Sequence, residues 1–534
     1  MRKLLFAILL FSSVAYAWSV PARRITQIYT LQDGSQQELT LTGDEFGHYF
    51  LSADGRAFLM DEEGIMQPVS ADEVRSRRQT RSLQRNSTRR VRQNITFQGT
   101  KRGLVILVNF SDKEFVTRSP QLTLSRIFNE HGYSEGYFTG SVHDYFYDQS
   151  YGLFDLEFDV VGPYTLSHNM AYYGENNSKG DDKRAATMVA EACRLADKDV
   201  DFARYDWDGD NEVDQVYVIY AGYSEASGAP PSTVWPHEWD LESATSIRDG
   251  DGAIRLDGTV INTYACSNEL QGTRGSRISG IGTACHEFSH CLGLPDMYDT
   301  TGKAFGMDCW DLLDYGCYNN DEYTPAPFTS YERMFCGWLT PIVLTGPATV
   351  EGLAPITLAP VAFIIYNKAN PNEFYMLENH QKQGWDSYSY GHGLLVIHVD
   401  YDEDAWYDNS VNDVASHQRM TIIPADNSLS GRNLAGDPFP GTSNNTSLTN
   451  TTQPAATLYN MNSDGQKLLS CPITNIQESA AGLISFETAG DQTDISDIKR
   501  EQDTSACYDF LGRILPSRPM SGFYLQGGKK YMNK

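Results

Sequence analysis

Several signatures of common catalytic and metal sites are missing from this 534-residue sequence. Its nine cysteines include no Cys-x-x-Cys pair, which argues against a structural zinc site built from thiolates. The sequence also has no Gly-x-Ser-x-Gly nucleophile elbow and no glycine-rich loop that ends in Lys-Ser or Lys-Thr. The sequence therefore has no motif typical of a serine hydrolase with a nucleophile elbow, of a phosphate-binding loop or of a zinc finger.

Basic residues are scarce. The chain has 42 Lys and Arg against 69 Asp and Glu, a formal net charge of -27. A protein that binds a phosphate backbone needs clustered Lys and Arg, so we do not expect nucleic acid as a partner. The excess carboxylates could instead bind a hard cation such as calcium.

The first residues predict export. Arg2 and Lys3 precede an apolar run over residues 4–11, and small residues at 15–17 form a cleavage site, so residues 1–17 read as a signal peptide. The run is shorter than the roughly 20 residues that span a bilayer. We therefore expect a secreted or cell-surface protein, in which the odd number of cysteines leaves at least one outside any disulfide.

Changes in composition divide the chain. Residues 75–102 are rich in Arg and poor in large apolar residues, as is typical of an exposed linker where an activating protease cuts. An ordinary linker between domains is the alternative. We predict a signal peptide, a propeptide with the Arg-rich linker, a catalytic domain, a β-rich domain and a last segment, at residues 1–17, 18–100, 101–339, 340–488 and 489–534.

The predicted fold class is α+β. Short apolar runs and turns over 25–66 indicate a small β-rich unit, and the apolar run at 103–110 indicates a buried strand that opens a new core. From residue 340 onward Val, Ile, Thr and Gly dominate, which favours strands. Two small hairpins are expected after residue 505.

The strongest motif is His286-Glu287-x-x-His290. Apolar residues at helical spacing surround it, so both histidines project from one face of a helix and can reach a single zinc ion. Glu287 then lies beside the metal, where it can act as the general base on zinc-bound water. Gly293 and Pro295 end the helix and turn the chain back.

The third zinc ligand is expected to be Asp296. No glutamate occurs between Glu287 and Glu322, which excludes a glutamate ligand about 20 residues after the motif. Asp296 instead stands where the extended metzincin motif has its third ligand. Four other aspartates remain open as competitors, namely Asp299, Asp308, Asp311 and Asp314.

A turn beneath the metal is expected at residues 310–316, where Leu313 stands in place of the methionine of the metzincin turn. Leucine has a similar volume, so an apolar floor is retained. Tyr315, two residues later, is a candidate to contact the metal or a developing oxyanion. A core tyrosine is the equally favoured alternative.

An acidic turn at residues 206–214 is a candidate calcium site, because carboxylates at alternate positions surround hard cations. Its ligands would be Asp206, Asp208, Asp210 and Asp214. It departs from an EF-hand at Asn211 and Tyr217, and a solvated acidic turn is the alternative.

With these residues in view, the chain resembles the immune inhibitor A-like zinc metallopeptidases, relatives of the metzincins, over about residues 20–480. The resemblance rests most strongly on residues 286–299 and is supported by residues 43–50 and 144–152; the three matches follow the family's order along the chain. It implies a zymogen with a zincin catalytic domain that cleaves proteins, zinc on His286, His290 and Asp296, calcium sites, and a β-rich domain after the catalytic one.

The last 30 residues resemble a C-terminal sorting domain of Bacteroidetes type IX secretion, judged from Gly512-Arg513, residues 522–524 and Lys529-Lys530. Secretion machinery would then be a partner, and a terminal hairpin of the preceding domain is the alternative. For function, two rivals to a protease stay open. One is an inactive zincin scaffold that binds partners at the surface, and the other is a zinc hydrolase of a non-peptide bond.

Overall fold

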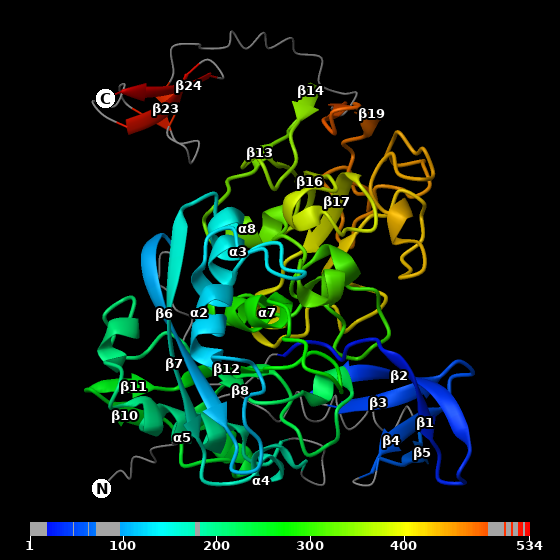
Figure 1. Ribbon diagram of the computed structural model, residues 1–534. Helices are drawn as coiled ribbons and strands as arrows, with labels where there is room; N and C mark the ends of the chain where they lie inside the picture. Colours follow the sequence, from blue (N-terminus) through cyan, green and yellow to red (C-terminus); the bar gives the residue numbers. More distant parts are fainter. Residues whose placement is uncertain are drawn as a thin grey trace, which may run out of the picture.

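The computed structural model combines helices with several β-sheets (Figure 1), in agreement with the expected mixture. The predicted signal peptide and most of the Arg-rich linker lie outside the described residues. Those residues are 19–45, 47–61, 64–70, 97–176 and 182–489, with the backbone of strands at 507–508, 514–515, 522–526 and 529–533.

An antiparallel sheet near the N-terminus runs in sequence order, as the turns in the sequence predicted. Gly34 and Gly55, which follow aspartates in two of these turns, have the positive φ that glycine favours. Leu39 and Leu41 point from one face into the molecular core. The strands are β1 (Thr26–Thr30), β2 (Gln36–Asp44), β3 (Gly47–Ser52), β4 (Ala57–Met60) and β5 (Met66–Val69).

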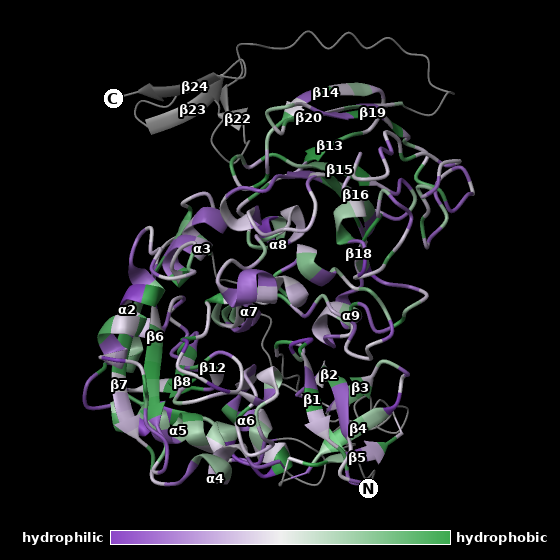
Figure 2. Cartoon of the chain, turned by 45° about the vertical axis from the view of Figure 1, so that its right-hand side comes forward, coloured by the Kyte–Doolittle hydropathy of each residue, from purple (hydrophilic) through white to green (hydrophobic). Residues whose placement is uncertain are grey.

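The central sheet has the order β7-β6-β8-β12-β9, with β9 antiparallel to its neighbour and the others parallel. Along β6, Val105 and Leu107 face one apolar core, while Leu104 and Ile106 face another. Burial on both faces explains its apolar run (Figure 2). The strands are β6 (Gly99–Asn109), β7 (Phe154–Thr165), β8 (Val216–Tyr220), β9 (His237–Asp240) and β12 (Thr263–Asn268).

Helices cover both faces of this sheet. Helices α2 (Pro120–Asn129), α3 (Val142–Gln149) and α7 (Gly282–Cys291) contribute to the core on one face, and α5 (Ala185–Ala196) packs on the other. The central sheet and helices thus form three layers, with α7 inside the molecule. Shorter elements are α4 (Met170–Gly174), α6 (Leu241–Ala244), β10 (Ile254–Leu256) and β11 (Thr259–Ile261).

The region after residue 340 is β-rich. Its five-stranded sheet packs one face against a three-stranded sheet and the other face against the core that contains α7. Every residue of β16 and β17 is therefore buried. The strands are β13 (Ile342–Val343), β15 (Phe363–Tyr366), β16 (Glu373–His380), β17 (Gly393–Asp400) and β18 (Met420–Ile422), with β14 (Ala348–Leu353), β19 (Ile473–Glu478) and β20 (Ile484–Thr488) in the second sheet.

Two helices accompany these sheets, α8 (Ser330–Phe335) and α9 (Glu403–Tyr407). At the C-terminus, β21 (Cys507–Tyr508) pairs with β22 (Ile514–Leu515), and β23 (Gly522–Gln526) pairs with β24 (Lys529–Asn533), so the two expected hairpins are present. The sorting function of that segment stays a prediction.

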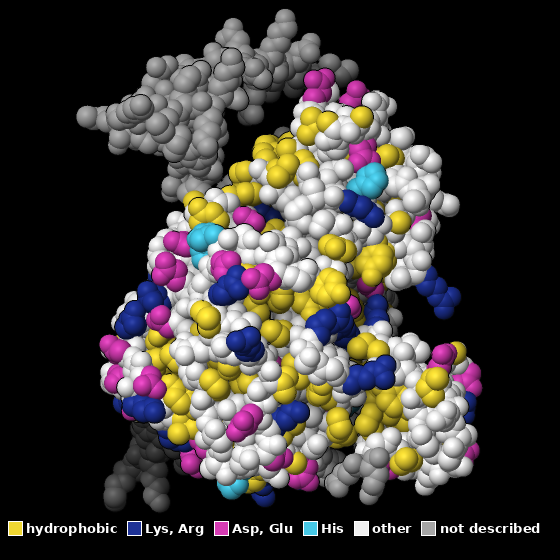
Figure 3. All heavy atoms as spheres, in the orientation of Figure 1, with side chains coloured by type: hydrophobic (Ala, Val, Ile, Leu, Met, Phe, Trp, Pro, Cys, Tyr) yellow, Lys and Arg dark blue, Asp and Glu magenta, His cyan; other side chains and the backbone are white. Residues whose placement is uncertain are grey.

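The described cysteine side chains, from Cys193 to Cys471, are buried free thiols. None of the helices in the described residues is long and apolar enough to cross a membrane. Acidic and basic side chains are interspersed over the surface seen in Figure 3.

Candidate metal centre and peptide cleft

Helix α7 brings the two motif histidines together. His286 Nδ1 lies 2.8 Å from the carbonyl oxygen of Leu312, and His290 Nδ1 lies 2.8 Å from that of Leu294. Because a carbonyl only accepts, each Nδ1 carries the proton and each Nε2 is left with a lone pair. The two Nε2 atoms lie 3.0 Å apart in full burial. Two lone pairs so close repel each other unless a proton or a metal ion lies between them.

Asp296 completes this group, because α7 ends where the sequence predicted. Gly293 has φ 110, and its N–H bonds to the carbonyl of His290 at 2.9 Å. Asp296 Oδ1 then lies 3.2 Å from His286 Nε2 and 3.3 Å from His290 Nε2, without a hydrogen-bond donor of its own among the described residues. Burial disfavours its charge, but the positive charge of the two imidazoles in their protonated form outweighs that effect and holds the pKa of Asp296 below its usual range.

These distances fit zinc. Tetrahedral zinc with bonds of about 2.0–2.1 Å places neighbouring ligand atoms about 3.3 Å apart. The other aspartates that the sequence left open are engaged elsewhere: Asp299 accepts backbone N–H groups of its own turn, and Asp308 pairs with Arg24. Asp311 and Asp314 likewise accept backbone N–H groups, from Leu313 and Met307.

Asn409, from the β-rich region, fixes the third ligand. Its Nδ2 donates to Asp296 Oδ2 at 2.7 Å, and its Oδ1 accepts the Asp296 N–H at 2.7 Å. The carboxylate is thereby turned so that Oδ1 faces the histidines. Such outer contacts orient metal ligands, and no local pattern could predict a partner 113 residues away.

Glu287 is completely buried beside the ligands. Its Oε1 accepts the N–H of Val20 at 2.9 Å, and its Oε2 has no hydrogen-bond partner among the described residues. Burial, together with the negative charge of Asp296, raises the pKa of Glu287 well above its usual range. A carboxyl group in such a setting is suited to take and return a proton near neutral pH.

The expected turn lies beneath His286. The carbonyl of Leu312 holds that histidine, and the carbonyl of the fully buried Leu313 accepts the N–H of Met297 at 2.8 Å. The ring of Tyr315 lies 3.4 Å from the guanidinium carbon of Arg24. Its role at the metal stays a prediction.

Residues 19–24, which we call the cleft segment, lie against this site. Besides the contact between Val20 and Glu287, the hydroxyl of Tyr298 donates to the carbonyl of Ser19 at 2.9 Å. The Ser19–Val20 peptide group is thus held at both its C=O and its N–H. The hydroxyl of Tyr318 donates to the carbonyl of Pro21 at 2.6 Å. Sequence reasoning missed these contacts, because they join residues about 270 to 300 positions apart.

Two arginines anchor the end of the cleft segment. Arg23 pairs with Asp321 at 2.5 Å and with Glu322 at 2.9 Å, while Arg24 pairs with Asp308 at 2.9 Å. Burial raises the pKa of Glu322 to about 7 even though Arg23 opposes this shift. The segment is therefore held against the candidate metal centre by both backbone and charged contacts.

The candidate calcium site at residues 206–214 is an acidic loop in the structure. Ligand oxygens of Asp206, Asp208 and Asp210 lie within 4.8 Å of one another. Asp214 is buried, and its carboxylate accepts the N–H of Trp207. The other three carboxylates accept N–H groups within the loop, so local turn geometry accounts for this arrangement. Calcium stays a sequence prediction.

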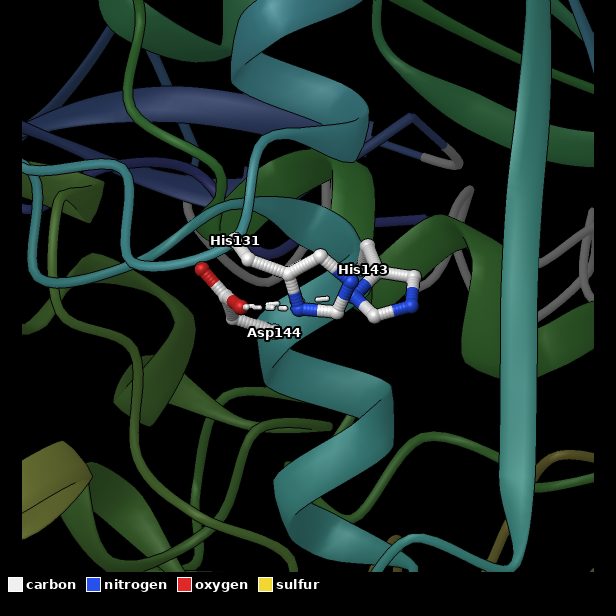
Figure 4. A group of neighbouring side chains, drawn as sticks. All are labelled: His131, His143 and Asp144. Atoms are coloured by element: carbon white, nitrogen blue, oxygen red, sulfur yellow. Dashed lines mark ion pairs between the residues drawn. The ribbon is translucent and has the colours of Figure 1, made fainter.

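A second histidine group, drawn in Figure 4, joins His131, His143 and Asp144. His143 Nε2 lies 2.8 Å from Asp155 Oδ1, and its Nδ1 faces Asp144 at 4.0 Å. Asp144 and Asp155 raise the pKa of His143 despite its burial. A protonated imidazole between two carboxylates accounts for this group without a metal.

Comparison with known proteins agrees with the resemblance inferred from the motifs. Over 239 residues, 39% of this chain, the sequence is 27% identical to the pre-pro-metalloprotease PrtV of Vibrio cholerae, of which it covers 25%. Over 274 residues, 43% of this chain, it is 23% identical to immune inhibitor A of Bacillus thuringiensis, of which it covers 39%. The chain thus spans a quarter to two-fifths of these relatives. Residues 93–337, which contain His286, Glu287, His290 and Asp296, match the immune inhibitor A peptidase M6 catalytic domain.

Proposed function

We propose that this protein is a zinc-dependent endopeptidase made as a zymogen. One observation carries the proposal: three buried ligand atoms, His286 Nε2, His290 Nε2 and Asp296 Oδ1, converge at 3.0–3.3 Å with Glu287 beside them. Bound zinc would lower the pKa of a coordinated water and polarise a carbonyl. The match to a peptidase catalytic domain supports a peptide bond as the target.

The protein's own groups supply the remaining chemistry. Glu287 takes the proton of the attacking water and returns it to the leaving amine. Its contact with the N–H of Val20 supports this role, because a peptide nitrogen in the cleft is already within reach of Oε1. The carbonyl of the same peptide group bonds to Tyr298, so a hydroxyl is available where negative charge would develop.

Latency follows from the cleft segment. A peptide substrate would need the space beside Glu287 that residues 19–24 fill, so removal of the N-terminal unit is required for activity. The Arg-rich linker at 75–102 offers a proteolytic site for this step. We also propose export through the predicted signal peptide, with the C-terminal hairpins as a sorting segment.

Metal analysis combined with digestion of a peptide mixture tests the function. Protein cut in the Arg-rich linker should contain zinc and cleave peptides, and a chelator should abolish cleavage. Glu287→Ala should keep zinc and lose activity about 10²–10⁴-fold. Retained turnover in this variant would refute the role of Glu287. Zinc without peptide cleavage in the native protein would favour a binding scaffold or a hydrolase of another bond.

A further inference from the structure

The side chain of Arg23 occupies an acidic pocket in the cleft. Its Nη1 lies 2.9 Å from Glu322 Oε1, its Nη2 lies 2.5 Å from Asp321 Oδ1, and its side chain is only 10% exposed. The guanidinium carbon is 5.6 Å from the centre of the Tyr318 ring. The backbone is held as well, since the Arg23 N–H donates to the carbonyl of Ala226 at 2.9 Å.

This pocket belongs to the catalytic part of the chain. Asp321 and Glu322 end the segment Tyr315–Glu322, which directly follows the turn that holds His286. Glu322 Oε2 is 3.5 Å from the hydroxyl of Thr283 in the first turn of α7. The pocket therefore remains part of the cleft after the N-terminal unit has been removed.

Removal of that unit takes away the arginine that pairs with Glu322. Glu322 is 3% exposed, and Arg23 is the ion-pair partner found for it among the described residues. Arg277 lies 3.5 Å from Asp321 and is half-exposed. A guanidinium that enters the vacated pocket would restore the ion pairs with Asp321 and Glu322, which favours a positively charged side chain there.

We propose that Asp321 and Glu322 form a substrate subsite for an arginine side chain. In the cleft segment, Val20 donates its N–H to Glu287, and Arg23 follows three residues later. The arginine of a substrate should therefore stand three residues C-terminal to the residue whose N–H contacts Glu287. The planar guanidinium can donate to both carboxylates at once, whereas a lysine ammonium offers only a point charge. This inference rests on the proposed peptidase function and adds a substrate class to it.

The test uses the full chain after cleavage in the Arg-rich linker, loaded with zinc. Three peptides are compared by kcat/KM. They differ only at the residue that corresponds to Arg23, which is Arg, Lys or Gln. The Arg peptide should exceed the Gln peptide about tenfold or more. Glu322→Gln and Asp321→Asn should bring this ratio toward one, and the zinc content and thermal unfolding of each variant report whether it folds.

Glu351→Gln, which removes an exposed carboxylate on β14, is the matched control and should keep the preference for Arg. An equal rate for all three peptides in the native enzyme would overturn the subsite while leaving the peptidase function intact. An undiminished preference in both pocket variants would overturn it too. Failure to cleave any peptide would instead refute the proposed function, on which the subsite depends.

Discussion

At the scale of single residues, two tyrosines compete for the role of stabilising negative charge on the substrate carbonyl. Tyr298 donates to the carbonyl of Ser19, and the N–H of the same peptide group, which belongs to Val20, donates to Glu287. Tyr315, the residue that the sequence suggested, instead lies against the guanidinium of Arg24. The contacts favour Tyr298, because its hydroxyl already bonds to a peptide carbonyl in the cleft.

Tyr298→Phe should therefore lower kcat about 10²-fold in the processed enzyme, with a small change in KM, as expected for a lost oxyanion donor. Steady-state kinetics on one peptide measures both constants. Tyr315→Phe is the comparison and should cost much less. An equal or larger loss in Tyr315→Phe would return the role to Tyr315.

The group of His286, His290 and Asp296 could be predicted from the sequence because its members are close together in the chain. The spacing of His286 and His290 follows from the helical repeat, and Gly293 and Pro295 mark the turn that returns Asp296. Asn409 and Tyr298 could not be assigned in this way. Asn409 reaches the site because the β-rich region packs against it. Tyr298 is distinguished from the other tyrosines only by its hydrogen bond to the cleft segment, which the sequence does not reveal.

At the scale of elements, β16 carries a buried charge cluster. His380 Nε2 lies 2.6 Å from Glu378, and its Nδ1 lies 3.0 Å from Asp386. Glu378 also accepts the N–H of Ser330, which ties α8 to the sheet. Burial disfavours the charged imidazole, but the two carboxylates prevail and raise the pKa of His380 to about 10.

The stability of the fold should depend on pH through this histidine. The folded protein keeps a proton that the unfolded chain loses above about pH 6.5. The stabilisation is therefore complete below that pH and is lost as pH rises through about 10. Relative to His380→Gln, the native protein should gain on the order of 3 kcal/mol at pH 6, and the gain should vanish near pH 10.

Urea unfolding at a series of pH values measures this difference. His392→Gln, which removes a half-exposed histidine paired with Glu478, is the control and should show no comparable trend. A constant difference between the native protein and His380→Gln across the range would contradict the prediction.

The apolar runs of β15 and β17 are continuous and typical of buried strands, whereas the sequence of β16 is not. Its two ends carry Glu373, Glu378 and His380, and such residues argue against a buried strand unless partners for them are known. Those partners come from elsewhere in the fold, since Glu373 pairs with His398 and His380 with Asp386. Local pattern cannot reveal charge pairs formed across a sheet.

At the scale of the whole molecule, residues 19–24 hold the N-terminal unit in the cleft. Their arginines make ion pairs with three carboxylates, from Asp308, Asp321 and Glu322. The strength of latency should therefore depend on these pairs. The division into propeptide and catalytic domain stays a prediction.

Replacement of Arg23 and Arg24 together by Ala should weaken latency and raise the activity of the uncleaved chain about tenfold. Hydrolysis of a fluorogenic peptide, with electrophoresis to confirm that the chain is intact, measures the effect. Arg56→Ala, which removes an exposed ion pair with Asp54 in the same unit, should change nothing. Unaltered activity in the double variant would mean that backbone contacts alone keep the enzyme latent.

The two hydrogen bonds between Asn409 and Asp296 bear on which part of the chain is needed for activity. The matched peptidase region stops at residue 337, yet the amide that aims the third ligand lies 72 positions later, beyond the first strands of the next sheets. A protein shortened to the predicted catalytic domain would keep every ligand and lose the group that steers one of them. The smallest active fragment should thus include the β-rich region, because that region orients Asp296 as well as stabilising the fold.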